Sequence, residues 1–106
     1  MVIEITSLEQ YNELKEKGTL VIDFWAPWCG PCKMYKPVFT KVSEEGVEGV
    51  TFATLNIDEE VGEEIAQEFG VTGIPYTALL KDGEMVADQS GVMMKDQLVD
   101  FITKNK

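Results

Sequence analysis

The apolar and polar positions of this chain alternate between two periods, one typical of β-strands and one typical of α-helices. Residues 2–5 and 50–57 carry apolar side chains at strand spacing and predict two strands. Residues 20–25, LVIDFW, are apolar on both alternating faces except at one aspartate, which predicts a central strand covered on both sides. Residues 77–88 predict two further strands, joined by an Asp-Gly dipeptide typical of tight hairpins.

Four segments have the spacing of amphipathic helices. The first covers residues 8–17, where Ser7 provides an N-cap and Gln10 stands at the capping-box distance from it. The second covers residues 32–45, and its apolar positions recur every three or four residues. A short acidic helix over 59–70 and a C-terminal helix complete the set. The apolar face of the C-terminal helix is expected to contain Leu98, Val99 and Ile102.

The order of these elements is strand, helix, strand, helix, strand, helix, followed by a two-stranded hairpin and a last helix. The first part requires parallel pairing through right-handed crossovers, and the hairpin adds antiparallel strands. The sequence therefore predicts an α/β fold with a mixed sheet and helices on both faces. With 106 residues, 44% of them apolar, the chain is expected to form one domain over 1–106 around an ordinary core.

The net charge of the chain disfavours some classes of binding partner. Its 19 acidic residues stand against nine lysines, with no arginine and no histidine, for a net charge of −10. Such a surface repels phosphate backbones and anionic lipid, so neither nucleic acid nor a membrane is an expected partner, and a monomer is favoured. The missing histidine excludes Cys-His and Ser-His-Asp catalytic arrangements and any histidine-ligated metal.

The N-terminal sequence MVIEITSLEQ has no basic segment followed by an apolar one. No apolar run elsewhere in the chain reaches the roughly 18 residues of a membrane span. We therefore expect a protein that stays unprocessed and works in the cytoplasm.

Cys29 and Cys32, within the segment WCGPC, are the only cysteines, and three interpretations of the pair are open. A structural zinc site needs four ligands, commonly thiolates or imidazoles, and this chain offers two thiols and no imidazole. A purely structural disulfide would close a loop of about four residues, which stabilises a fold by only about 2 kcal/mol. No metal site is therefore expected, and the third interpretation, a redox reagent, is favoured.

The redox interpretation has a physical basis of its own. Where a central strand meets a helix, Cys29 lies beside unpaired N–H groups and the positive end of the helix dipole, which favour thiolate over thiol. Cys32 follows one turn later on the same face, close enough for a disulfide to open and close without refolding. Pro31 suits an early helical position, where no intrahelical N–H bond is lost, and Gly30 leaves the approach to Cys29 clear of a side chain.

Three segments make the chain resemble the thioredoxin family over essentially its whole length: VIDFWAPWCGPCK at 21–33, GIPYTALLKDGE at 73–84 and SGVMMKDQL at 90–98. The resemblance implies a thioredoxin fold, a five-stranded sheet of order 1-3-2-4-5 flanked by four helices, with a cis-proline at Pro75. It also implies a protein-disulfide reductase without a bound cofactor. Its partners would be disulfide-containing proteins and a reductase that restores the dithiol, usually an NADPH-linked flavoprotein.

Carried over by position, the resemblance makes Cys29 the attacking thiolate and Cys32 the resolving thiol. An apolar shelf beside them would receive an extended segment of the substrate. The expected substrate-binding positions are Trp28, Gly30, Pro31, Gly73, Ile74, Pro75 and Gly91. Trp25, by contrast, is expected in the core.

Asp23 lies in an otherwise apolar strand, two residues before Trp25. Burial there should raise the pKa of its carboxyl group and let it accept a proton at neutral pH. The resemblance implies that this base serves Cys32. The alternative is a strand-end carboxylate that is exposed to water.

Two positions depart from the family pattern. Thr54 stands on the third strand where many members have a lysine near the buried aspartate, and the loss of that cation should raise the pKa of Asp23 further. Tyr76 follows Pro75, where the family usually has threonine, so its ring either alters the substrate shelf or packs beside it.

Three other functions stay open. An oxidant or isomerase of an oxidising compartment would use the same dithiol at a higher reduction potential. A binding module would use the fold as a rigid subunit, with incidental redox chemistry. Glutaredoxin-like chemistry with glutathione is disfavoured, because those proteins usually carry an aromatic residue at the position of Gly30.

Overall fold

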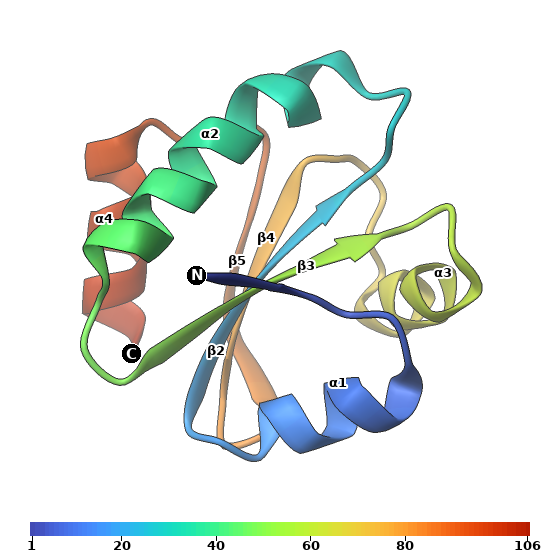
Figure 1. Cartoon of the computed structure of the whole chain (residues 1–106), viewed down its shortest axis with the longest axis horizontal. Coiled ribbons are helices and arrows are strands. Elements are labelled where there is room, and N and C mark those ends of the chain that lie inside the picture. The colour runs from blue at the N-terminus through green and yellow to red at the C-terminus, as the bar shows by residue number, and fades with distance from the viewer.

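The computed structural model describes residues 1–106 and contains a five-stranded sheet with helices on both faces (Figure 1). The strands are β1 (Val2–Glu4), β2 (Thr19–Trp25), β3 (Val50–Asn56), β4 (Tyr76–Lys81) and β5 (Glu84–Ser90). The helices are α1 (Leu8–Lys15), α2 (Gly30–Glu45), α3 (Glu60–Phe69) and α4 (Lys95–Asn105). The α/β class and the order of elements predicted from the pattern are therefore confirmed.

Strand β2 lies at the centre of the sheet, whose order is β1-β3-β2-β4-β5. It pairs in parallel with β3 and antiparallel with β4, and β1 pairs in parallel with β3. The hairpin partner β5 forms the edge next to β4. This order confirms the one that the resemblance implied, and it places the carboxyl end of the central strand just before the start of α2.

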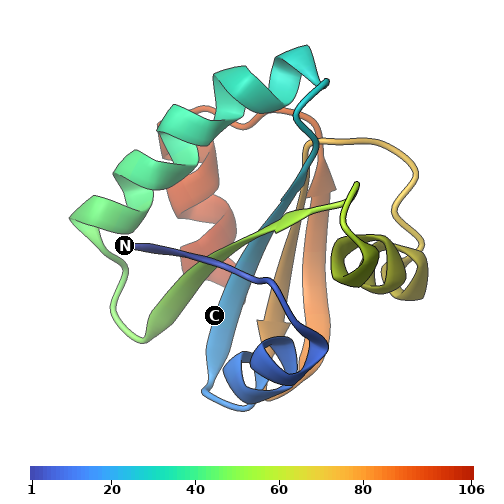
Figure 2. The same cartoon turned by 45° about the vertical axis from the view of Figure 1, so that its right-hand side comes forward.

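Helices cover both faces of the sheet (Figures 1 and 2), and each face has its own hydrophobic core. Helices α1 and α3 cover one face, where Ile65 packs in the same cluster as Phe24. Helices α2 and α4 cover the other face, where Phe39 and Phe101 pack with Val21. Because successive side chains of a strand point to opposite faces, the odd-numbered residues of β2 lie under α2 and α4.

The start of α2 differs from the sequence prediction. The helix begins at Gly30 rather than at Cys32, because Pro31 fits within the first turn, where no intrahelical N–H bond is needed. Helix α1 ends at Lys15, two residues before the predicted end. The earlier start makes Cys29 the N-cap residue of α2, which matters for its chemistry.

The inner face of α4 contains the three predicted residues and also Phe101. Leu98 and Ile102 are buried as expected, and Phe101 is buried with them. Val99 is only half-buried, at the margin of this face. With 3.6 residues per turn, the residues three and four positions after Leu98 lie on the same face of the helix, and these are Phe101 and Ile102.

Gly62 lies in α3, close to the end of β3. A side chain has no room there, because a Cβ atom would lie 2.6 Å from the carbonyl carbon of Asn56 and closer still to its oxygen. The missing side chain therefore lets the helix approach the backbone at the end of β3.

Gly62→Ala should lower the free energy of unfolding by more than about 2 kcal/mol, because the helix or the backbone of Asn56 has to shift. Helix propensity alone would change that free energy by about 1 kcal/mol in the opposite direction. Urea unfolding measures the difference, with Glu64→Ala, an exposed position of the same helix, as the matched control. A Gly62→Ala protein as stable as the wild type would contradict the close approach.

Candidate active site

The two cysteines lie at the start of α2, one turn apart. Cys29 is the N-cap residue, and its backbone is still extended, with φ −90° and ψ 112°. Its sulfur accepts a hydrogen bond from the backbone N–H of Cys32, with 3.2 Å between the two atoms. The side chains form a disulfide, with 5.3 Å between the Cα atoms. The helix donor expected to favour a Cys29 thiolate is therefore in place.

Apolar side chains enclose this pair. Cys29 is 5% exposed and Cys32 is 2% exposed, so neither sulfur is freely accessible. Trp25, Ile57 and Ile74 pack around them. A target disulfide therefore has to make close contact with this surface before it can reach Cys29.

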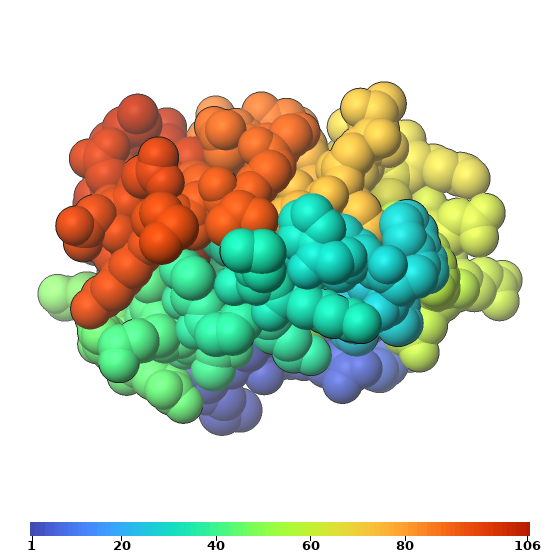
Figure 3. Space-filling model, turned by 90° about the horizontal axis from the view of Figure 1, so that it is seen from above, coloured from blue at the N-terminus to red at the C-terminus, as the bar shows by residue number.

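Three of the predicted substrate-binding residues gather beside Cys29. The sulfur of Cys29 lies 3.9 Å from the carbonyl oxygen of Ile74, and the bond from Ile74 to Pro75 is cis, as the resemblance implied. The N–H of Gly91 donates to the carbonyl oxygen of Pro75 over 2.8 Å. Gly91 has a φ of 91°, a conformation that favours glycine. Figure 3 shows the start of α2, in cyan, against the yellow and orange segments that precede β4 and follow β5.

The other predicted substrate-binding residues lie at the surface: Trp28, Gly30, Pro31 and Gly73. Trp28 is 67% exposed, and its indole N–H donates to a carboxylate oxygen of Asp58 over 3.1 Å. A Cβ atom at Gly30 would meet no atom within 4 Å, and the φ of Gly30 is not positive. The backbone therefore does not require glycine at this position.

Asp23 is buried, with 1% exposure, on the face of β2 that α2 covers. It stands opposite Thr54 of β3 and Thr77 of β4, and these two neighbours are buried as well. One of its carboxyl oxygens, Oδ1, has no hydrogen-bond partner. Burial raises the pKa of Asp23 from its ordinary 3.8 to about 7, while the nearby Lys36 charge lowers it. The prediction of a buried carboxyl group with a raised pKa is therefore confirmed, and the exposed alternative is wrong.

Lys36 is a charged group that the sequence analysis missed. The family comparison suggested that Asp23 lacks a nearby cation because Thr54 replaces a lysine, but Lys36 of α2 acts on it instead. The Lys36 ammonium lies 4.5 Å from the centre of the Trp25 ring. Trp25, expected in the core, is half-buried, and its indole N–H is buried without a partner. The sequence signal was the position of Lys36, one helical turn after Cys32.

A buried hydrogen bond between α2 and β4 was also missed. The hydroxyl groups of Tyr35 and Thr77 lie 2.8 Å apart, and both side chains are fully buried. Burial is the main cause of the raised pKa of Tyr35, so its hydroxyl stays protonated at neutral pH. This bond joins the helix that carries the cysteines to the strand beside Asp23.

Tyr76 packs away from the dithiol, which decides between its two predicted placements. Its ring belongs to the core under α1 and α3, with its centre 5.6 Å from that of Phe24. Its hydroxyl donates to a carboxylate oxygen of Asp88 over 2.5 Å. The ring therefore does not enter the face that carries Cys29.

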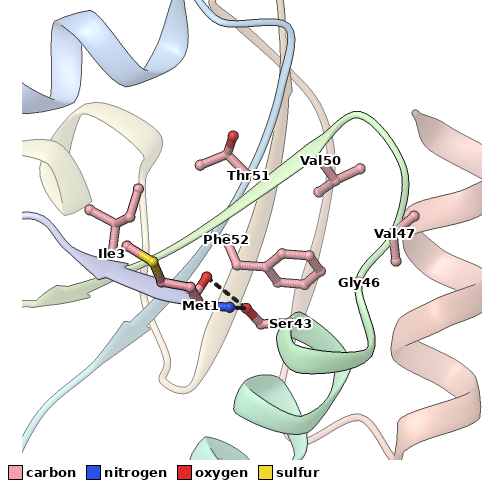
Figure 4. A pocket seen from close by; sticks show the side chains of 8 residues that line it. All are labelled: Met1, Ile3, Ser43, Gly46, Val47, Val50, Thr51 and Phe52. Atoms are coloured by element: carbon pink, nitrogen blue, oxygen red, sulfur yellow. Dashed lines mark hydrogen bonds between the residues drawn. The ribbon is translucent and has the colours of Figure 1, made fainter.

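A shallow hollow of about 250 Å³ lies elsewhere, where β1 and β3 meet the end of α2 (Figure 4). In it, the Ser43 hydroxyl accepts from the amino group of Met1 over 2.8 Å and donates to the Met1 carbonyl oxygen over 2.7 Å. None of the predicted site residues lines this hollow. No three His, Cys, Asp or Glu side chains are grouped to hold a metal, and none of the helices is both long and apolar enough to cross a membrane.

A dithiol at the junction of a central strand and a helix, with a buried carboxyl group on that strand, defines a thiol–disulfide oxidoreductase. The family model described as Thioredoxin matches residues 2–104. A thioredoxin of Pseudomonas aeruginosa is 39% identical, over 98% of this chain and 95% of its own length. The chain belongs to the thioredoxin family.

Solved structures agree with this assignment. The crystal structure of thioredoxin from Malassezia sympodialis matches with a TM-score of 0.87 and 35% identity, over 99% of this chain and 90% of that chain. A structure concerned with thiol resolution in yeast mitochondrial 1-Cys peroxiredoxin through glutathione and thioredoxin systems matches with a TM-score of 0.82 and 32% identity, over 96% of this chain and 94% of that chain. The protein is therefore a protein-disulfide reductase that acts by dithiol–disulfide exchange, with disulfide-containing proteins and a reductase as partners.

The raised pKa of Asp23 has a consequence for stability. The folded protein keeps the carboxyl proton up to about pH 7, whereas the unfolded chain loses it near 3.8, so the stability of the wild type falls as the pH rises between these values. Asp23→Asn removes this dependence. Between about pH 5 and about pH 8 the variant should gain about 2–3 kcal/mol in free energy of unfolding relative to the wild type.

Urea unfolding of the oxidised proteins at both pH values measures this gain. Asp96→Asn is the matched control, because Asp96 is exposed and its substitution should give the same difference from the wild type at both pH values. A difference in free energy of unfolding between Asp23→Asn and the wild type that stays the same at both pH values would contradict a raised pKa of Asp23.

Proposed function

We propose that Cys29 is the nucleophile and Cys32 the resolving thiol of this reductase, which acts as one domain over residues 1–106. The observation that carries this assignment is the hydrogen bond from the Cys32 N–H to the Cys29 sulfur at the N-cap of α2. A thiolate at that position is stabilised by the helix end, while Cys32 lies inside the helix and is less exposed.

In the reduced protein the Cys29 thiolate attacks one sulfur of a target disulfide. The bond between the two target sulfurs breaks, one target thiolate leaves and takes up a proton, and a mixed disulfide joins Cys29 to the target. The Cys32 thiol then loses its proton to Asp23, and its thiolate attacks the Cys29 sulfur. The second target thiolate leaves, so two electrons have passed to the target and the Cys29–Cys32 disulfide has formed.

We assign Asp23 as the group that accepts the proton of the Cys32 thiol. Its buried position and its pKa of about 7 support this role, because a base is most effective when its pKa lies near the working pH. Thr54 and Thr77 on either side are neutral, so they do not replace the carboxyl group as a base.

The substrate segment is proposed to lie on a shelf made by Ile74, Pro75 and Gly91, with Trp28 as its wall. The Cys29 sulfur lies 3.9 Å from the Ile74 carbonyl oxygen, which supports this, since a segment lying there meets the reactive sulfur. The exposed ring of Trp28 supports it as well. Gly30, Pro31 and Gly73 would border the approach and keep it open.

The disulfide has to be reduced again after each turnover. We assign this step to an NADPH-linked flavoprotein reductase and place the protein in the cytoplasm as a monomer. Membership of the thioredoxin family supports the reductase, and a dithiol that donates electrons needs a compartment kept reducing.

Cys32→Ser should trap the target, because the mixed disulfide on Cys29 then has no resolving thiol. Incubation with insulin, followed by electrophoresis without reductant, should show a covalent adduct that dithiothreitol removes. Cys29→Ser is the matched control and should give no adduct. Equal adduct formation by the two variants would contradict the division of roles.

Asp23→Asn should slow the resolving step by about tenfold or more at slightly alkaline pH, because Cys32 loses its base. Stopped-flow reaction with an aromatic disulfide that releases a coloured thiol separates the attack by Cys29 from the release caused by Cys32. The attack phase should keep its wild-type rate, as it should in the control Asp96→Asn. A second phase as fast as in the wild type would exclude Asp23 as the base.

A further inference from the structure

The groups packed around Asp23 are almost all uncharged. Its neighbours across the sheet, Thr54 and Thr77, are neutral, and the Tyr35 hydroxyl of α2 is engaged with Thr77. The side chains that α4 buries on this face, Leu98, Phe101 and Ile102, are all apolar. Cys32 is held in the disulfide of the oxidised protein. A carboxylate at Asp23 therefore depends on charge from farther away.

Lys36 is the cation that supplies such a charge. It lies on α2 one turn after Cys32, and its ammonium sits 4.5 Å from the centre of the Trp25 ring. An ammonium over an aromatic face is attracted by the negative face of the ring. Trp25 follows Asp23 by two residues on the same face of β2, so the ring holds the ammonium near the carboxyl group.

The charge of Lys36 is not neutralised by another residue. The ion pairs of the protein join Lys95 with Glu45 and Lys104 with Asp100, and Lys36 takes part in neither. Lys36 and Asp23 are themselves farther apart than a direct ion pair allows. The effect of the ammonium on the carboxyl group therefore acts through space and falls with added salt.

We propose that Lys36 is a positioning residue whose ammonium, held over Trp25, stabilises the Asp23 carboxylate across the helix–sheet interface and so keeps it available as the base for Cys32. The consequence for Cys32 rests on the proposed function of Asp23 as its base. The stabilisation of the Asp23 carboxylate by Lys36 is independent of that proposed function. The direction of the Lys36 contribution agrees with this, since it lowers the pKa of Asp23 against the larger effect of burial.

Lys36→Met removes the charge and keeps an apolar side chain over the ring. In the oxidised protein, a carboxyl-carbon NMR titration should then show the pKa of Asp23 raised by about half a pH unit or more. Lys36→Arg keeps the charge and should restore the wild-type titration. Lys41→Met removes one charge from an exposed position of the same helix and should leave the titration within about 0.2 pH units of the wild type.

Two results would overturn the proposal: an Asp23 titration that Lys36→Met leaves unchanged, or one that Lys41→Met moves as far. The first would show that the ammonium does not reach the carboxyl group. The second would show that the pKa of Asp23 follows the net charge of the protein and not the position of Lys36. Because Lys36 is exposed, all three variants are expected to fold, and urea unfolding checks this.

The resolving step provides a second readout. The pH dependence of its rate is measured with the coloured aromatic disulfide. The apparent pKa of this profile should rise in Lys36→Met by as much as the pKa of Asp23 does in the titration, while attack by Cys29 keeps its rate. A titration that moves without the resolving step would overturn the base role of Asp23 and with it the link from Lys36 to Cys32. Adduct formation by Cys32→Ser is independent of both results, so the assignment of the two cysteines stands or falls separately.

Discussion

The start of α2 depends on the hydrogen bond from the backbone N–H of Cys32 to the sulfur of Cys29. Helices usually begin with a hydroxyl, carboxylate or amide oxygen that accepts from the first unpaired N–H groups. Here the acceptor is a sulfur of the Cys29–Cys32 pair, and charged acceptors form stronger hydrogen bonds than neutral ones. One atom therefore both completes a helix end and belongs to the redox-active disulfide. Three residues join this cap to the central strand, so the position of the sulfur follows from the sheet.

The burial of Asp23 links function to stability. A carboxyl group enclosed by α2 and by two threonine-bearing strands holds its proton near neutral pH, which suits a base for a thiol. The same enclosure makes the ionised form unfavourable for the fold. The pair formed by Lys36 and Trp25 counters part of this effect from the edge of the helix. The site therefore holds a carboxyl group poised between its two protonation states, which an exposed aspartate would not provide.

The two faces of the sheet separate the core under α1 and α3 from the site that contains Asp23. Tyr76 and Thr77 are consecutive in β4 and point to opposite faces. The ring of Tyr76 packs with Phe24 in one core, whereas the Thr77 hydroxyl bonds to Tyr35 on the face that carries Asp23. A shift of one residue in the pairing of β4 would exchange these roles. The pairing of Asp23 with Thr77 is therefore as important to the site as the identities of the residues.

Local patterns in the sequence determined the order of the elements, the place of the dithiol at a strand–helix junction and the burial of Asp23. Each of these depends on residues within one strand or one helical turn, where the period of the backbone decides which side chains share a face. Only the tertiary structure decided that Lys36 supplies the cation near Asp23, that Tyr35 bonds to Thr77 and that Tyr76 packs away from the dithiol. The physical reason is that periodicity reports the face on which a residue lies, whereas its neighbours across a helix–sheet interface depend on strand register and on how the helix is set against the sheet.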